Sequence, residues 1–189
     1  MKRIGVLALQ GAVREHVQML EKLGCEAVTI TRTEDLAGLD GLVLPGGEST
    51  TMRKLLDRYE LLEPIRVLAK NGLPMFGTCA GLILLALDVV DYESHLAVMD
   101  VKVARNSYGR QVDSFEALLN IKDIGEDIPT VFIRAPHIEA VGEQVEILAT
   151  YDDKIVLARD GHLLGCSFHP ELTQDTRIMA YFIHNMVAL

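Results

Sequence analysis

The chain has 189 residues, and 49% of them are hydrophobic, which is enough to build the core of one domain spanning residues 1–189. Its net charge of −9 argues against nucleic acid or an anionic membrane as a partner, because both repel negative charge. The longest apolar run, residues 82–87, is far shorter than the ~20 residues that span a bilayer. No signal-peptide pattern follows Met1, so we expect a cytoplasmic protein.

The first half of the chain alternates strand-like and helix-like segments. Apolar or β-branched runs predict four strands, at residues 3–9, 25–31, 41–44 and 73–76. Helices are predicted after Gly11, from about Ser49 and from about Leu82. Such alternation with short connections is typical of an α/β fold with a mostly parallel central sheet.

From about Ala97 the pattern changes to short strand-like runs, which predicts an antiparallel extension of the sheet. These runs cover residues 98–104, 115–121, 130–134, 145–150, 155–158 and 163–168. The Asp160-Gly161 pair predicts a hairpin between the last two. Residues 175–187 then predict an amphipathic helix with Ile178 and Phe182 on its apolar face.

A candidate nucleophile lies in the sequence GTCAG at residues 77–81. This is the nucleophile-elbow pattern G-x-S-x-G with Cys79 in the serine position, between a predicted strand and a predicted helix. The sharp turn needs glycine neighbours, and the start of a helix favours a reactive thiolate. A buried structural cysteine is the alternative. We prefer the nucleophile because strand, turn and helix occur together.

The sequence His169-Pro170-Glu171 supplies the base and the orienting carboxylate that a cysteine nucleophile needs. Pro170 favours an extended conformation for His169, in which residues two apart lie on the same side. The motif follows a predicted strand, and the carboxyl ends of parallel strands meet at one edge of a sheet. Combined with Cys79, it predicts a catalytic triad.

The other histidines and cysteines are expected to have packing or surface roles. These residues are His16, His184, His95, His162, Cys25 and Cys166. We expect His16 and His184 at the surface or its boundary, whereas His137, near Arg134, is a minor candidate for supporting the site. No cluster has the spacing of metal ligands, so neither a metal nor a cofactor is expected.

A second glycine-rich turn joins a strand to a helix at residues 45–51, PGGESTT. It lacks the lysine of a phosphate-binding loop. Its backbone N–H groups suit an oxyanion, which one of these glycines would hold together with the N–H of Ala80. The alternative is a plain tight turn with Ser49 as the helix N-cap.

These three motifs together resemble the class I (triad) glutamine amidotransferases. Further segments are similar to the glutaminase subunits of pyridoxal 5′-phosphate synthase. In chain order they are LALQGA at 7–12, GGESTT at 46–51, GTCAGL at 77–82, RNSYGRQ at 105–111, FIRAP at 132–136 and SFHPEL at 167–172. The segments at 105–111 and 132–136 are the most specific, and the resemblance covers essentially the whole chain.

The resemblance implies a flavodoxin-like three-layer α/β sandwich in which Cys79 is the nucleophile and His169 and Glu171 complete the triad. It implies contacts with bound L-glutamine from Gly46, Gly47, Glu48, Arg105, Ile133 and Arg134. It places Gln10 near the oxyanion loop, and we expect the oxyanion hole at Gly47 and Ala80. It also implies a separate synthase chain as the partner in a large hetero-oligomer, and weak activity without that partner.

The expected reaction is attack of Cys79 on the side-chain amide of glutamine, release of ammonia, and hydrolysis of the thioester. Two alternatives remain open from the sequence. One is the glutaminase subunit of a different biosynthetic synthase. The other is a cysteine-elbow hydrolase or chaperone acting on small electrophiles or peptides. A pure binding module is disfavoured by the complete triad.

Overall fold

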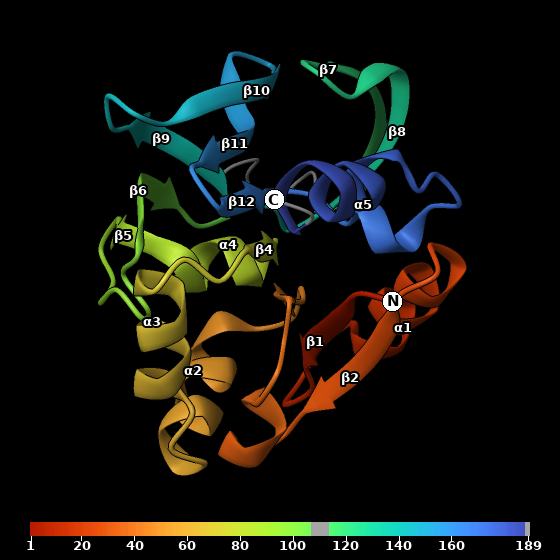
Figure 1. Ribbon diagram of the computed structural model, residues 1–189. Helices are drawn as coiled ribbons and strands as arrows, with labels where there is room; N and C mark the ends of the chain where they lie inside the picture. The colour runs from red at the N-terminus through yellow and green to blue at the C-terminus, as the bar shows by residue number, and fades with distance from the viewer. Residues whose placement is uncertain (107–113, 188–189) are drawn as a thin grey trace.

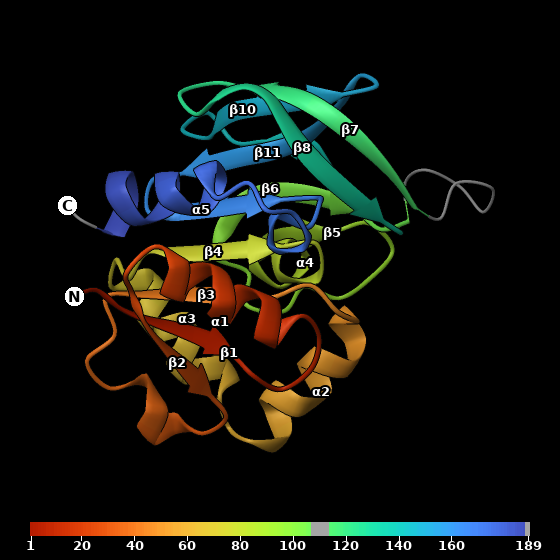
Figure 2. The same ribbon diagram turned by 90° about the vertical axis from the view of Figure 1, so that its right-hand side faces the viewer.

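A curled mixed sheet runs through the molecule, with helices on both sides of its parallel half (Figure 1). The computed structural model describes residues 1–106 and 114–187. The parallel half contains, in spatial order, β2 (Glu26–Ile30), β1 (Arg3–Leu7), β3 (Gly41–Leu44), β4 (Met75–Thr78) and β12 (Leu163–Cys166). Two of these strands, β1 and β4, point the same way in Figure 2, so their carboxyl ends lie at one edge.

The sheet continues beyond β12 with antiparallel strands. Next come β11 (Lys154–Asp160), β9 (His137–Val141), β6 (Met99–Ala104) and the edge strand β5 (Ala86–Val89), while β10 (Glu146–Tyr151) also pairs with β11. Strand β5 is parallel to β6, whereas β11 is antiparallel to β12, and β9 is antiparallel to both of its neighbours, β11 and β6. A separate antiparallel hairpin is formed by β7 (Ser114–Ile121) and β8 (Gly125–Ile133). The mostly parallel sheet with an antiparallel extension is therefore confirmed.

The helices cover the two faces of the parallel half. On one face lie α1 (Val13–Lys22) and α5 (Arg177–Tyr181), and on the other lie α2 (Ser49–Arg58), α3 (Leu62–Lys70) and α4 (Ala80–Leu85). Because successive strand residues face opposite sides, Val43 of β3 packs in the cluster of α1 and α5. Its neighbours Leu42 and Leu44 pack in the cluster of α2, α3 and α4. These two cores confirm the predicted three-layer α/β arrangement.

The structure differs from the sequence prediction at several element boundaries. The predicted helix from Ser49 is two helices, because Glu60 has a left-handed backbone (φ 57°) that ends α2 before α3 begins. Strands β5 and β9 were not predicted. The last helix begins at Arg177 and continues as a π-helix over Phe182–Val187. No helix within residues 1–106 and 114–187 has the length and apolar character needed to cross a membrane.

Candidate active site

Cys79 lies on a sharp turn between β4 and α4, as the elbow motif predicts. Its backbone is left-handed (φ 51°, ψ −105°), a strained conformation that costs on the order of 1–3 kcal/mol. A Cβ on Gly77 would lie 2.5 Å from the backbone of Gly81, and one on Gly81 would lie 2.0 Å from the Leu44 carbonyl oxygen. Glycine is therefore required on both sides of the turn.

His169 and Glu171 follow β12, and both side chains are buried beside the elbow. The distance from His169 Nδ1 to Glu171 Oε1 is 2.6 Å, and the exposed fractions of Cys79, His169 and Glu171 are 7%, 7% and 6%. The predicted extended geometry is wrong beyond His169, because Pro170–Leu172 form a 3₁₀ turn. Proline fits the first position of such a turn, and the turn brings the Glu171 carboxylate back to the imidazole.

The protonation of His169 is set by its two neighbours. Burial alone lowers the pKa of His169, but hydrogen bonding and charge interactions with Cys79 and Glu171 outweigh burial and raise the pKa to about 10. The imidazole is therefore protonated at neutral pH. A histidinium at this position carries a proton for a leaving group.

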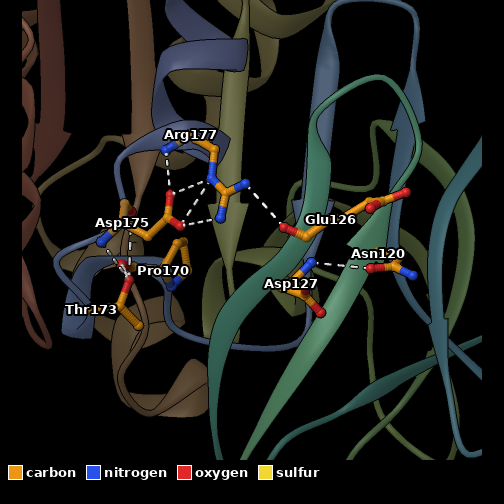
Figure 3. A network of polar contacts seen from close by, with 7 residues as sticks. All are labelled: Asn120, Glu126, Asp127, Pro170, Thr173, Asp175 and Arg177. Carbon is orange, nitrogen blue, oxygen red and sulfur yellow. Dashed lines mark hydrogen bonds and ion pairs between the residues drawn. The ribbon is translucent and has the colours of Figure 1, made fainter.

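The segment after the triad turn is fixed to the β7–β8 hairpin by Arg177 (Figure 3). The Arg177 guanidinium makes a two-pronged contact with the Asp175 carboxylate, with a shortest distance of 2.6 Å, and donates to the Glu126 carbonyl oxygen at 3.0 Å. We call this the Arg177 clasp. At the other end of the hairpin, the His169 N–H donates to the Val131 carbonyl oxygen of β8 at 2.8 Å. The hairpin is thus anchored twice near the triad.

The Gly46-Gly47 turn packs directly against the triad. A Cβ on Gly46 would lie 2.3 Å from His169 Cε1, and one on Gly47 would lie 2.3 Å from Gln10 Oε1. The Glu48 N–H donates to Gln10 Oε1 at 2.8 Å. Gln10 therefore lies behind the turn and holds its backbone, which gives a physical reason for its position near the predicted oxyanion loop.

The N-cap of α2 is Glu48, so the alternative with Ser49 as the N-cap is wrong. The Glu48 carboxylate accepts hydrogen bonds from the Thr50 N–H at 3.2 Å and from the Thr51 N–H at 2.6 Å. Burial raises the pKa of Glu48, but hydrogen bonds from Thr51 and Thr50 lower it to about 2. Arg105 lies 3.4 Å from Glu48 Oε1, so an ionised carboxylate and a guanidinium stand side by side.

A pocket of about 510 Å³ opens above these residues. The predicted site residues that line it are Gly46, Gly47, Glu48, Cys79, Ala80, Arg105, Ile133, Arg134 and His169. Gln10 and Glu171 stand behind this lining, next to Gly47 and His169 respectively. Residues 107–111 of the RNSYGRQ segment lie outside the described residues. Elements far apart in the sequence therefore bring the predicted residues to one cavity.

Sequence reasoning missed His16 of α1, which lies directly against the triad. Its expected surface position is wrong, because His16 is fully buried (0% exposed). Its Nε2 atom lies 3.1 Å from Thr78 Oγ1 and 3.5 Å from Glu171 Oε2. The signal was present in the sequence, since His16 lies three residues after Val13 and four before Leu20, at helical spacing.

The other two cysteines pack in the core, as expected. Cys25 and Cys166 are buried members of the same hydrophobic cluster. Burial raises the pKa of Cys166 well above its usual value, which makes this thiol a poor nucleophile. Of the three cysteines, Cys79 is the one that lines the pocket. His137 lies in β9 opposite Ala104, next to the pocket residue Pro136.

Comparisons with known proteins agree on one family. The sequence profile of the SNO glutamine amidotransferase family matches residues 6–188. The chain is 64% identical to the pyridoxal 5′-phosphate synthase subunit PdxT of Geobacillus thermodenitrificans (strain NG80-2), over 98% of this chain and 95% of the relative. It is 61% identical to the same subunit of Anoxybacillus flavithermus (strain DSM 21510 / WK1), over 99% of this chain and 97% of the relative.

One solved structure, described as a crystal structure of glutamine amidotransferase, superposes closely on this chain. Its TM-score is 0.93 and its sequence is 46% identical, with 98% of this chain and 99% of that chain covered. The shared architecture therefore extends over the whole sheet and its helices.

Proposed function

The chain belongs to the SNO glutamine amidotransferase family, and from this premise we propose that it is the glutaminase subunit of a pyridoxal 5′-phosphate synthase. It hydrolyses L-glutamine to L-glutamate and ammonia and delivers the ammonia to the synthase subunit. The observation that carries this function is the buried Cys79–His169–Glu171 arrangement at the base of a pocket of about 510 Å³. The match over residues 6–188 supports one catalytic domain.

The Cys79 sulfur attacks the side-chain amide carbon of glutamine, and this forms a tetrahedral intermediate. The His169 imidazolium gives its proton to the leaving ammonia, which is consistent with a pKa raised to about 10. Glu171 holds the ring through its 2.6 Å contact with Nδ1. Neutral His169 then takes a proton from water, the resulting hydroxide attacks the thioester, and glutamate leaves.

The oxyanion of the intermediate is held by backbone N–H groups of Gly47 and Ala80. Both residues line the pocket, Gly47 on the turn after β3 and Ala80 at the start of α4. Gln10 supports the first turn by accepting the Glu48 N–H. Each preorganised donor of this kind contributes about 3 kcal/mol to transition-state stabilisation.

The α-carboxylate and α-ammonium groups of glutamine are recognised by charged residues at the pocket wall. Arg105 suits the carboxylate, because a guanidinium matches a carboxylate in a two-pronged contact. Glu48 stays ionised at neutral pH, since its pKa is about 2, and it suits the ammonium group. Ile133 and Arg134 line the same wall and complete the contacts with substrate.

The two alternatives considered from the sequence lose their support. Relatives that are 58–64% identical carry the name of a pyridoxal 5′-phosphate synthase subunit, which argues against a different synthase. Family membership argues equally against a hydrolase or chaperone unrelated to glutamine. A large hetero-oligomer with the synthase subunit remains our proposal. A cytoplasmic location is supported by three cysteines that are all free thiols.

The test is glutamate release from glutamine, measured for this protein alone and with the synthase subunit. We expect strong stimulation by the partner and complete loss in Cys79→Ala, because the thioester cannot form. Cys25→Ala removes a buried cysteine outside the pocket and serves as the matched control, with activity retained. Glutamate release by Cys79→Ala at the wild-type rate would disprove the mechanism.

A further inference from the structure

His16 occupies a buried position beside Glu171 of the triad and Thr78, the residue before its cysteine. Its Nε2 atom lies 3.1 Å from the hydroxyl of Thr78, the residue before Cys79, and 3.5 Å from the free carboxylate oxygen Oε2 of Glu171. The other Glu171 oxygen, Oε1, contacts His169. The His16 imidazole therefore lies between the strand that carries the nucleophile and the carboxylate that orients the base.

The surroundings of the His16 ring favour one tautomer. A hydrogen on Nε2 faces a carboxylate oxygen and a hydroxyl oxygen, which both attract it. A hydrogen on Nδ1 would be buried without an acceptor, because Nδ1 has no hydrogen-bond partner among the described residues. An unpaired buried donor is unfavourable, so the proton belongs on Nε2. Glu171 Oε2 has no hydrogen-bond partner among the described residues, and the His16 Nε2 atom, 3.5 Å away, faces it as a long polar contact.

His16 supports Glu171 without cancelling its charge. Burial lowers the pKa of His16, His169 lowers it further, and attraction to Glu171 and Glu15 opposes this without reversing it. The ring is thus neutral at neutral pH. A lysine or arginine in this place would compete with the His169 imidazolium for the Glu171 carboxylate, whereas a neutral donor leaves that carboxylate available.

We propose that His16 is a positioning residue that fixes Glu171 relative to the Cys79 elbow and so keeps the His169 ring aligned for proton transfer. It acts through Glu171 and Thr78 and has no contact with the reacting atoms. This inference rests on the triad roles proposed above. A residue that only fills the core would be replaced by an apolar side chain of similar size without kinetic effect.

The test compares His16→Leu with His16→Gln in the glutaminase assay with the synthase subunit present. Leucine fills the space without a donor, whereas glutamine places an amide N–H donor near the Nε2 position. We expect kcat of His16→Leu to fall by about 10- to 100-fold, because the hydrogen bond with Thr78 and the polar contact with Glu171 are lost together. We expect KM for glutamine to stay unchanged, and most of kcat to return in His16→Gln.

Two further variants act as controls. His162→Leu removes another histidine that has a hydrogen bond, from Nε2 to the Ala69 carbonyl oxygen at 2.6 Å, outside the pocket, and should keep wild-type kcat. Cys79→Ala in the same assay tests the proposed mechanism itself. Wild-type kcat in His16→Leu together with an inactive Cys79→Ala would overturn the role of His16 and leave the glutaminase intact.

A second variant covers the case in which His16→Leu does not fold. Thr78→Val replaces the hydroxyl that holds the ring with a methyl group of similar size. Because His16 then keeps Glu171 as a partner but loses Thr78, we expect a smaller fall in kcat than in His16→Leu, again without a change in KM. Unchanged kcat in folded Thr78→Val, or His16→Gln as inactive as catalytically dead Cys79→Ala, would contradict the proposal.

Discussion

At the residue scale, the active site depends on the absence of a side chain at Gly46. The His169 ring lies so close to the Gly46 backbone that an added Cβ would fall 2.3 Å from Cε1 and 2.8 Å from Nδ1. The ring cannot move away freely, because Nδ1 is held by Glu171. A displacement of the base is therefore the expected result of any larger residue at position 46.

We expect Gly46→Ala to lower kcat by about 100-fold, the effect of misplacing a catalytic group by roughly 1 Å. Glutamate release with the synthase subunit present is the measurement. Gly24→Ala is the matched control, because Gly24 has a left-handed backbone (φ 77°) but no atom within 4 Å of an added Cβ. It should lose stability and keep kcat. A fully active Gly46→Ala would show that the ring does not occupy this position during turnover.

The pH dependence of stability provides a second prediction at the residue scale. The pKa of His169 rises from 6.5 in the unfolded chain to about 10 in the folded protein, so the folded state binds the proton more tightly. The stabilisation is fully present below pH 6.5 and is lost as the pH rises toward about 10. His169→Asn lacks this titration. The Tm of the wild type, relative to that of His169→Asn, should therefore fall as the pH rises from 6.5 toward about 10.

Thermal melting of both proteins between pH 6.5 and about pH 10 measures this effect. The comparison reports His169 together with the Cys79 and Glu171 groups coupled to it, because the remaining titrating groups are shared by the two proteins. A difference in Tm that is the same at every pH would mean that His169 is not protonated in the folded state.

At the element scale, the β7–β8 hairpin forms its own sheet, packs its inner side chains such as Phe132 into the core cluster of α1 and α5, and is held by polar anchors as well. One is the Arg177 clasp at the hairpin turn, and another is the bond from the His169 N–H to the Val131 carbonyl oxygen. Strand β8 also ends in the pocket residue Ile133. The hairpin thus connects a surface ion pair to the wall of the substrate pocket.

Arg177→Met keeps the aliphatic stem and removes the clasp. We expect faster hydrogen exchange of the β7–β8 amides, and a KM for glutamine raised by up to about tenfold, because the substrate wall is less ordered. Arg3→Met is the control, since it removes an exposed ion pair with Glu26 at the edge of the parallel sheet. Unchanged exchange in β7–β8 would show that the clasp does not hold the hairpin.

At the scale of the whole molecule, apolar patterning was enough to predict the layers. Strands buried on both faces, such as β3, appear as continuous apolar runs, and all six runs predicted after residue 97 are strands. Strand β5 was missed because its first residues continue the apolar run of α4. Strand β9 was missed because its side chains are mostly half-buried or exposed and give little alternation.

The candidate site could be proposed from the sequence where its residues are close together. Cys79 and the His169–Glu171 pair were singled out because an elbow and a three-residue motif are local patterns. His16 and the contact from Arg177 to Glu126 were not found, because the partners Thr78 and Glu126 are 62 and 51 residues away. No spacing rule joins residues at such separations, and only the folded sheet brings them together.

The position of β12 determines when the sheet can be completed during synthesis of the chain. Among the described strands it comes last in the chain, yet it pairs with β4 on one side and β11 on the other. Until it emerges from the ribosome, the two halves of the sheet have no common strand, and Cys79 lacks the base that we propose for it. A growing or prematurely ended chain that stops before residue 163 therefore carries the thiol but cannot consume glutamine. Because β12 lies at the centre of the sheet, we expect glutamine hydrolysis only after β12 and the residues that follow it have been synthesised.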